Sequence, residues 1–250
     1  MTSVTFRFYA ELNDLLPEYH RFKDIKEGFK GRQSVKHLIE SLGIPHTEVD
    51  LILANSHPVD FSYIPREHDH ISVYPVFETF NIANLSTLRP QPLREPKFVL
   101  DGHLGRLAAY LRMLGFDTLY QNNYMDEELA DISVNKNRIL LTRDRGLLKR
   151  SKVTRGFLLK TMDPRQQLLS VVWRFDLLDR ILPFSRCIAC NGIFEAVDKL
   201  EISDQLESKT RKYFEKFKRC KECGKIYWKG SHHSRMLALI EWMMEKSGCE

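Results

Sequence analysis

Two Cys-x-x-Cys pairs in the last quarter of the chain constrain its fold more than any other feature. Cys187 and Cys190 bracket two residues, as do Cys220 and Cys223, and the twenty-nine residues 191–219 separate the pairs. Four thiolates at this spacing can close a tetrahedral Zn²⁺ site. Such a site has no open coordination position, so we expect a structural zinc rather than a catalytic one.

The same cysteines are also compatible with two disulfides or with two redox-active pairs. The N-terminal sequence MTSVTFRFYAEL alternates and carries charge, so it does not have the pattern of a signal peptide. We therefore expect a cytoplasmic protein with reduced thiols, which argues against disulfides. Redox motifs rarely occur twice in one chain, so the doubled spacing favours a metal site.

The distribution of charge points to a polyanionic partner. The chain has 250 residues and a formal net charge of +5. Residues 1–93 carry nine Lys/Arg against twelve Asp/Glu, whereas residues 94–250 carry twenty-nine against twenty-one. The excess positive charge of the second part suggests a nucleic acid or a similar partner.

The N-terminal part has the pattern of a small α+β domain. Alternating apolar residues over 4–8 predict a half-buried strand. Ser34 is placed to N-cap a helix, and further strands are expected at 51–54 and 71–76. Strands around one helix predict a ubiquitin-like β-grasp domain over residues 1–80.

This domain resembles the ubiquitin-like sulfur carriers of thiamin and molybdopterin synthesis in VTFRFYAELNDLLP, SLGIPHTEVDLILAN and HDHISVYPVF. Those carriers act through a free C-terminal Gly-Gly. Here the chain continues through FETFNIANLSTLRPQ without a Gly-Gly pair, so we expect a docking module for a protein partner rather than sulfur transfer. Pro90, Pro92 and Pro96 indicate a linker over 81–96.

Beyond the linker, short apolar strands alternate with helices. The strands are expected at 97–100, 118–121, 138–142 and 157–161. Four such strands predict a parallel sheet that helices cover on both faces.

Acidic residues follow these strands at the positions where open parallel sheets bind ligands. Asp101 comes after KFVL and Asp144 after RILLTR, while Asp126 opens the helix after the second strand. Converging carboxylates are hard ligands suited to Mg²⁺ or Mn²⁺. A pair of such ions would activate water and stabilise the leaving oxygen of a phosphodiester.

Each of these acids has a structural alternative as a helix cap. We favour capping for Asp163, which precedes a proline at the start of a helix. Three further acids are expected on solvated faces, and they are Asp117, Glu127 and Glu128.

Basic side chains flank the acids and are candidates for holding phosphates. The candidates are His103, Arg106, Arg143, Arg145 and Lys149. Arg112 and Arg150 lie in the same segments, with Arg112 away from the apolar stripe of its helix. The alternative is that these residues form a solvated surface.

The zinc segment carries a second basic surface. Ten Lys/Arg stand against two acids from Lys209 to Arg235, and Lys229 and His232 are candidates for contacting a nucleic acid. Five aromatic residues are interleaved with these cations, where they can stack on bases or pack a small core around the zinc. They are Tyr213, Phe214, Phe217, Tyr227 and Trp228.

Five stretches of the chain resemble, in this order, the ribonuclease family named for the C-terminal domain of Mut-seven. They are FVLDGHLGRLAAYLRMLGFDTLY, DEELADIS, NRILLTRD, RCIACNGIF and CKECGKIYWKGSHHSRM. The resemblance covers 97–242 and implies a metal-dependent ribonuclease with a PIN-like fold, an appended zinc ribbon and an N-terminal β-grasp module. Asp101, Asp126 and Asp144 fall on the acidic motif positions of the family. Asp163 matches only by looser analogy with PIN nucleases.

We therefore expect an α/β protein with a β-grasp domain at 1–80, a linker at 81–96, a PIN-like nuclease domain at 97–182, and a zinc ribbon with a C-terminal helix at 183–250. Its expected cofactors are a structural Zn²⁺ and a catalytic Mg²⁺ or Mn²⁺, and its expected substrate is RNA. The alternatives are a non-catalytic RNA- or ribosome-binding protein and a β-grasp-based partner adaptor.

Overall fold

The computed structural model describes residues 2–76, 88 and 95–247, so the expected linker at 81–96 lies almost wholly outside the described residues. The chain divides into two compact units, one formed by residues 1–95 with 123–160 and the other by 96–122 with 161–250. No helix in the described part of the chain is long and apolar enough to span a membrane.

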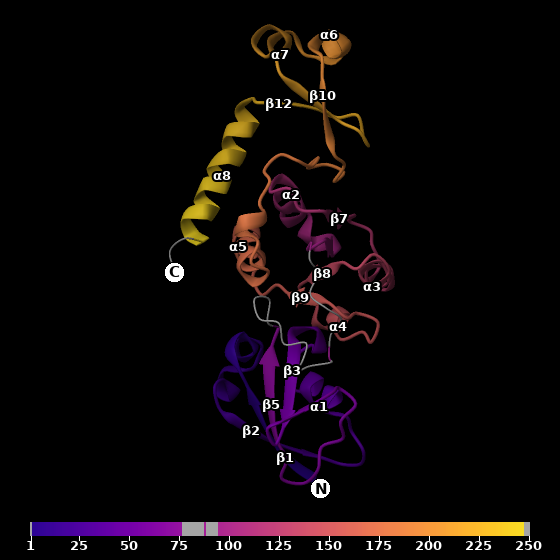
Figure 1. Cartoon of the computed structure of the whole chain (residues 1–250), viewed down its shortest axis with the longest axis vertical. Helices are drawn as coiled ribbons and strands as arrows, with labels where there is room; N and C mark the ends of the chain where they lie inside the picture. The colour runs from indigo at the N-terminus through magenta and orange to yellow at the C-terminus, as the bar shows by residue number, and fades with distance from the viewer. Residues whose placement is uncertain (1, 77–87, 89–94, 248–250) are drawn as a thin grey trace. The chain divides into compact units, whose positions relative to one another are not determined.

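The first unit opens with a five-stranded mixed sheet in the order β2-β1-β5-β3-β4 (Figure 1). Strands β1 and β5 pair in parallel, and the other neighbours pair antiparallel. Together with helix α1, this order is a β-grasp arrangement, as the sequence predicts. The elements are β1 (Thr2–Phe8), β2 (Asp24–Phe29), α1 (Val35–Ser41), η3 (His46–Glu48), β3 (Val49–Ala54), β4 (His57–Val59) and β5 (His70–Pro75).

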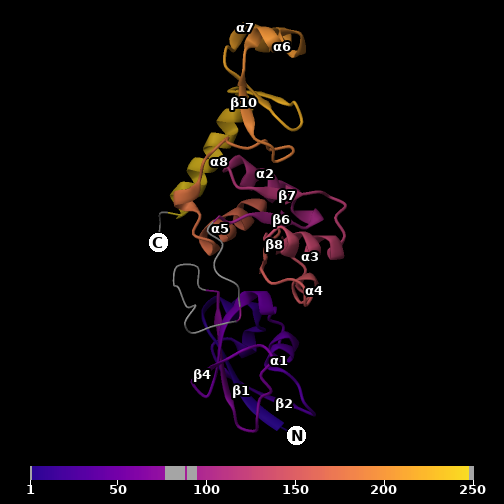
Figure 2. The same ribbon diagram turned by 45° about the vertical axis from the view of Figure 1, so that its right-hand side comes forward.

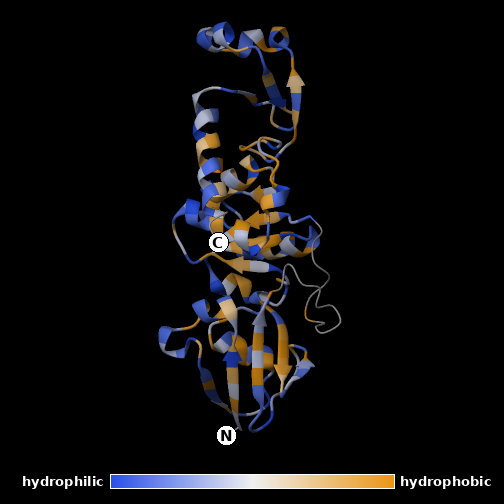
Figure 3. Cartoon of the chain, turned by 60° about the vertical axis from the view of Figure 1, so that its left-hand side comes forward, coloured by the Kyte–Doolittle hydropathy of each residue, from blue (hydrophilic) through white to orange (hydrophobic). Residues whose placement is uncertain are grey.

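Local sequence signals explain these elements. Val4, Phe6 and Phe8 alternate along β1 and are buried. Apolar and polar residues also alternate along the strands of this sheet in Figure 3. The Ser34 hydroxyl caps α1 by accepting the His37 amide at 3.3 Å.

The rest of the first unit supplies two parallel strands and two helices. These are α3 (Asp126–Asn135), β8 (Ile139–Thr142), α4 (Arg145–Leu148) and β9 (Gly156–Leu158). Strands β8 and β9 pair in parallel, and the apolar faces of α3 and α4 are buried.

The second unit holds the other two parallel strands, β6 and β7, which pair with each other. The four strands β6 to β9 belong to a parallel sheet with flanking helices, which confirms the expected fold class. The elements of this part are β6 (Phe98–Leu100), η4 (Gly102–Leu104), α2 (Gly105–Met113), β7 (Thr118–Tyr120) and α5 (Pro164–Arg174).

A zinc-ribbon-like segment and a long helix complete the second unit. Strands β10, β11 and β12 form an antiparallel sheet, and the small helices α6 and α7 lie beyond the end of β10 (Figure 2). The elements are β10 (Phe194–Val197), α6 (Lys199–Ile202), α7 (Ser208–Tyr213), β11 (Phe217–Cys220), β12 (Ile226–Trp228) and α8 (Ser231–Ser247).

Candidate metal centres and nucleic-acid surface

The four cysteines of the two Cys-x-x-Cys pairs converge on one point. Their Sγ atoms all lie within 4.8 Å of one another. Cys187 and Cys223 are 3.7 Å apart, Cys190 and Cys220 are 3.4 Å apart, and all four are free thiols. Zn–S bonds of about 2.3 Å place the sulfurs of a tetrahedral site roughly 3.8 Å apart. The donor set therefore fits a structural zinc and not a pair of disulfides.

Two of the thiols have environments that shift their pKa values in opposite directions. Burial acts to raise the pKa of Cys187, but hydrogen bonds from Tyr227 and from backbone amides outweigh it and lower that pKa to about 7. Burial raises the pKa of Cys190 to about 12. The Tyr227 hydroxyl lies 3.2 Å from the Cys187 sulfur, so it can donate to the thiolate that a bound metal requires.

Arg112 anchors the first Cys-x-x-Cys turn to the sheet. Its side chain is buried, and Nη1 donates to the carbonyls of Ile188 (3.1 Å) and Ala189 (2.9 Å). Its Nε donates to the carbonyl of Thr118, at the start of β7 (2.9 Å). Arg112 is therefore a structural clamp and not part of a solvated surface.

Asn191 forms a second anchor beside it. Its amide oxygen accepts the backbone N–H of Thr118 (2.9 Å), and its amide nitrogen donates to Asp117 (2.8 Å). Asp117 also lies 3.7 Å from the guanidinium of Arg186. The prediction that Asp117 lies on a solvated face is therefore wrong. Sequence patterns did not reveal these roles, because Asn191 lies more than 70 residues from Asp117 and Thr118 along the chain.

Asp101 directly follows β6, and its side chain does not cap the short helix η4. The turn that carries it is tightly packed against the end of β7. Tyr120 donates to the carbonyl of Gly102 at 2.9 Å, and a Cβ on Gly105 would lie 2.7 Å from the Tyr120 hydroxyl. The glycine at position 105 therefore allows the close approach of Tyr120 to the Asp101 turn.

Asp126 and Asp144 lie in the first unit. Asp144 follows β8 and is the N-cap of α4, where its carboxylate accepts the Gly146 amide at 2.6 Å. Asp126 is the first residue of α3 rather than its cap, and it lies 3.4 Å from the Arg150 guanidinium. Among the described residues, no cation pairs with Asp144, although basic residues surround it in the sequence.

Asp163 is the N-cap of α5. Its carboxylate accepts the amides of Arg165 (2.7 Å) and Gln166 (3.3 Å), which confirms the capping interpretation.

The candidate phosphate ligands differ in their surroundings. Arg143 is half-buried, and its Nε has no hydrogen-bond partner among the described residues. Four other candidates are exposed. His103 lies on η4 and Arg106 on α2, and Lys229 and His232 lie in the segment from β12 to α8.

A family model described as Mut7-C RNAse domain matches residues 96–240, which is more than half of the chain. The chain belongs to the Mut7-C RNAse domain family. A second model, described as Mut7-C ubiquitin, matches residues 1–81 and confirms the ubiquitin-like domain. No curated protein and no solved structure gives a significant match.

The ubiquitin-like domain of this Mut7-C chain holds two of the candidate phosphate ligands. Arg145 donates to the carbonyl of Leu15 (3.2 Å), and Lys149 donates to the carbonyl of Glu40. Carbonyl oxygens are neutral acceptors, so these hydrogen bonds orient the two cations without neutralising them.

Buried polar contacts continue this intramolecular interface. The carboxylate of Glu48 accepts the Leu158 amide of β9 at 2.7 Å. The ring of His46 lies 2.7 Å from the Glu40 carboxylate and 2.8 Å from the Val153 carbonyl. One face of the ubiquitin-like domain is therefore occupied by the family's nuclease segment.

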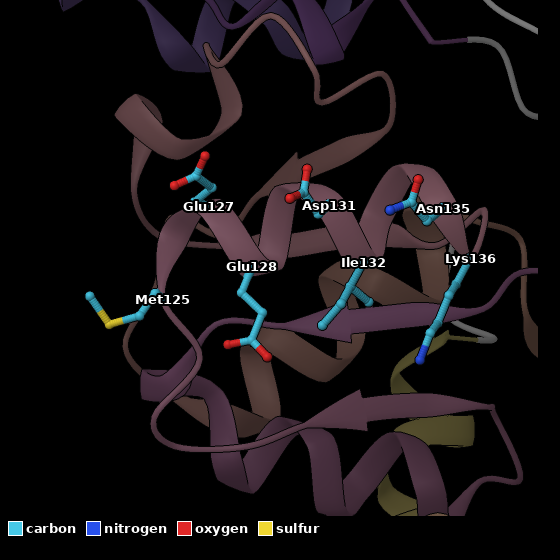
Figure 4. Close-up of a pocket in the computed structure, with 7 residues that line it drawn as sticks. All are labelled: Met125, Glu127, Glu128, Asp131, Ile132, Asn135 and Lys136. Atoms are coloured by element: carbon cyan, nitrogen blue, oxygen red, sulfur yellow. The ribbon is translucent and has the colours of Figure 1, made fainter.

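An open cavity of ≈ 440 Å³ lies along α3 in the Mut7-C RNAse domain (Figure 4). None of the acids or bases proposed for the site lines it, and Asp131 at its edge pairs with Lys152 at 2.9 Å. Its lining residues are Met125, Glu127, Glu128, Asp131, Ile132, Asn135 and Lys136.

Proposed function

We propose that this chain is a metal-dependent ribonuclease that hydrolyses RNA phosphodiester bonds. Membership of the Mut7-C RNAse domain family indicates a nuclease. The observation that carries the finer proposal is Asp144 at the carboxyl end of β8, whose carboxylate caps α4 but pairs with no cation among the described residues. Arg143 precedes it in the sequence, and the Arg143 Nε has no hydrogen-bond partner in the described part of the chain. A carboxylate that no cation neutralises, preceded along the chain by a guanidinium with an unused N–H, suits a metal ligand beside a phosphate ligand.

In this proposal, Asp101, Asp126 and Asp144 hold Mg²⁺ or Mn²⁺. Asp101 and Asp144 follow the carboxyl ends of parallel strands, and those ends meet at one edge of a parallel sheet. The metal would supply an activated water and stabilise charge on the leaving oxygen. The proposed role of the three carboxylates is to hold the metal and to orient the attacking water.

Basic side chains of the chain hold the RNA backbone. Arg143 or Arg106 contacts the scissile phosphate, because each lies within five residues of a proposed metal ligand. The neighbouring phosphates are bound by His103, Arg145 and Lys149. The basic residues of the zinc ribbon, including Lys229 and His232, guide the strand.

The proposed domain boundaries remain 1–80, 97–182 and 183–250. We also propose a cytoplasmic setting for the protein.

The decisive experiment compares RNA cleavage by the wild type and by Asp144→Asn, with Mn²⁺ or Mg²⁺. An asparagine oxygen can still accept the Gly146 amide, so α4 keeps its cap while the metal ligand loses its charge. We expect the rate to fall by about two orders of magnitude or more. Asp163→Asn is the matched control, because Asp163 caps a helix in the same way and should retain activity.

Equal rates for wild type and Asp144→Asn would show that the activity comes from another site or from a contaminant. Tight RNA binding without cleavage would favour the non-catalytic RNA- or ribosome-binding protein.

A second candidate function is a partner adaptor based on the ubiquitin-like domain. The observation that favours it is a pair of exposed rings on this domain, Tyr19 and Phe22. If it is correct, Tyr19→Ala with Phe22→Ala should abolish capture of a protein partner by the full chain and leave RNA cleavage unchanged.

A further inference from the structure

The structure sorts the five aromatic residues of the basic zinc segment into two groups. Phe217 is buried in a small core, Phe214 packs against that core, and Tyr227 contacts the Cys187 sulfur. Two rings are left facing solvent, with Tyr213 68% exposed and Trp228 39% exposed. Tyr213 is not among the residues of this core, whereas the Trp228 ring centre lies 6.4 Å from that of Phe217, so the core accounts for only part of Trp228.

Both exposed rings contact a neighbouring side chain. Tyr213 ends α7, and the Lys212 ammonium lies 5.5 Å from the centre of its ring. Trp228 ends β12, and its ring centre is 6.4 Å from that of Phe214. A Cβ on Gly230 would lie 2.9 Å from the indole nitrogen of Trp228, so only glycine lets the indole lie over this turn. A ring packed as that of Trp228 loses little freedom when a ligand stacks on it.

The zinc segment that carries these rings is basic, with ten Lys/Arg against Glu215 and Glu222 from Lys209 to Arg235. Two of the acids of the ribbon, Glu195 and Glu215, are already paired with Arg219 and Lys199. By contrast, five lysines of the ribbon are exposed, and within the described residues their side chains make no ion pair, hydrogen bond or ring contact. They are Lys209, Lys216, Lys221, Lys225 and Lys229.

We propose that Tyr213 and Trp228 form a stacking platform for unpaired RNA bases and that the free lysines hold the adjoining phosphates. The inference rests on the proposed function for the choice of RNA, and it specifies single-stranded RNA as the substrate class. In a duplex the bases are already stacked on one another, so exposed rings gain contacts mainly from single strands. An acidic protein would be attracted by the lysines but would not need the rings.

The test measures RNA affinity of the full-length Asp144→Asn protein, which keeps the RNA intact. A fluorescent unstructured oligouridine is compared with an RNA duplex of equal length. Tyr213→Ala should weaken binding of the single strand by about tenfold, whereas Tyr213→Phe should keep it. Duplex affinity should stay the same in both variants. Tyr19→Ala is the matched control, because Tyr19 is also 68% exposed but lies in the ubiquitin-like domain.

Tryptophan fluorescence gives an independent readout. Stacking of a base on Trp228 should quench its emission, and Trp228→Phe should abolish the quenching, because Trp173 and Trp242 lie on other elements. Zinc content and thermal unfolding of each variant check that the ribbon remains folded.

Unchanged affinity in Tyr213→Ala, or equal loss of single-strand and duplex binding, would overturn the platform. An acidic polypeptide that displaces the single-stranded RNA equally well from the wild type and from Tyr213→Ala would also overturn the platform. If single-strand binding depends on Tyr213 but no RNA is cleaved, the platform stands and the proposed ribonuclease activity falls.

Discussion

Asp69 shows how one residue can hold the ubiquitin-like domain together. It is buried and accepts hydrogen bonds of 2.7 Å each from the Tyr63 hydroxyl, the Arg66 amide and the Asn55 side chain. Burial acts to raise the pKa of Asp69, but these hydrogen bonds outweigh it and hold the pKa below its ordinary value. The folded state therefore favours the charged form.

Replacing Asp69 by Asn should make the ubiquitin-like domain less stable and less sensitive to acid. Because the pKa of Asp69 is lowered on folding, its charge stabilises the fold above the unfolded pKa of roughly 3.9. That contribution is lost as the pH falls through the folded pKa. We expect Asp69→Asn to lower the free energy of unfolding by about 2 kcal/mol at pH 7.

Chemical denaturation at several pH values, followed through NMR signals of this domain, measures the effect. Glu18→Gln, a change at an exposed residue, is the control. An identical pH dependence in wild type and Asp69→Asn would contradict the assignment.

Single residues with local signals were predictable from the sequence. Ser34 and Asp163 cap helices as expected, and the Cys-x-x-Cys spacing identified the four cysteines that converge. Arg112 was not predictable, because its partner Ala189 is 77 residues away along the chain. A long-range hydrogen bond leaves no periodic trace in a sequence, so its geometry is visible only in the fold.

The four strands of the parallel sheet were predictable because each is a short apolar run. The contact between the ubiquitin-like domain and β9 was not, because Glu48 is 110 residues from Leu158 in the chain. Glu48 is buried, and its carboxylate satisfies an amide of a three-residue strand. A buried amide without an acceptor costs about 1–3 kcal/mol, so this contact ties the domain to β9.

Glu48→Ala should loosen β9 and leave the ubiquitin-like sheet folded. The Leu158 amide would lose its acceptor, so we expect its hydrogen exchange to accelerate and the free energy of unfolding to fall by about 1–3 kcal/mol. Glu67→Ala is a matched control, because the carboxylate of Glu67 also accepts a backbone amide, that of Ser3 at 2.9 Å, but at an exposed position. Equal protection of Leu158 in wild type and Glu48→Ala would show that the contact does not hold β9.

At the scale of the whole molecule, zinc binding and the nuclease fold are linked through the second unit. Arg112 and Asn191 join the first Cys-x-x-Cys turn to Thr118 at the start of β7. The energy of metal binding is folding energy where the ligands are free in the unfolded chain. Removal of zinc should therefore destabilise β7 as well as the ribbon.

We predict one zinc per chain, lost in Cys220→Ser, and a consequent loss of protection at the Thr118 amide. Without the metal, the first turn would no longer hold Asn191 in place to accept that amide. Metal analysis measures the zinc, and hydrogen exchange measures Thr118 against an internal reference, the Phe6 amide of β1 in the first unit. Asn191→Ala separates the two steps, because it should retain zinc and still release Thr118. Purified protein without zinc would contradict the metal site. Zinc loss with unchanged exchange at Thr118 would show that the ribbon and the sheet are held together without the metal.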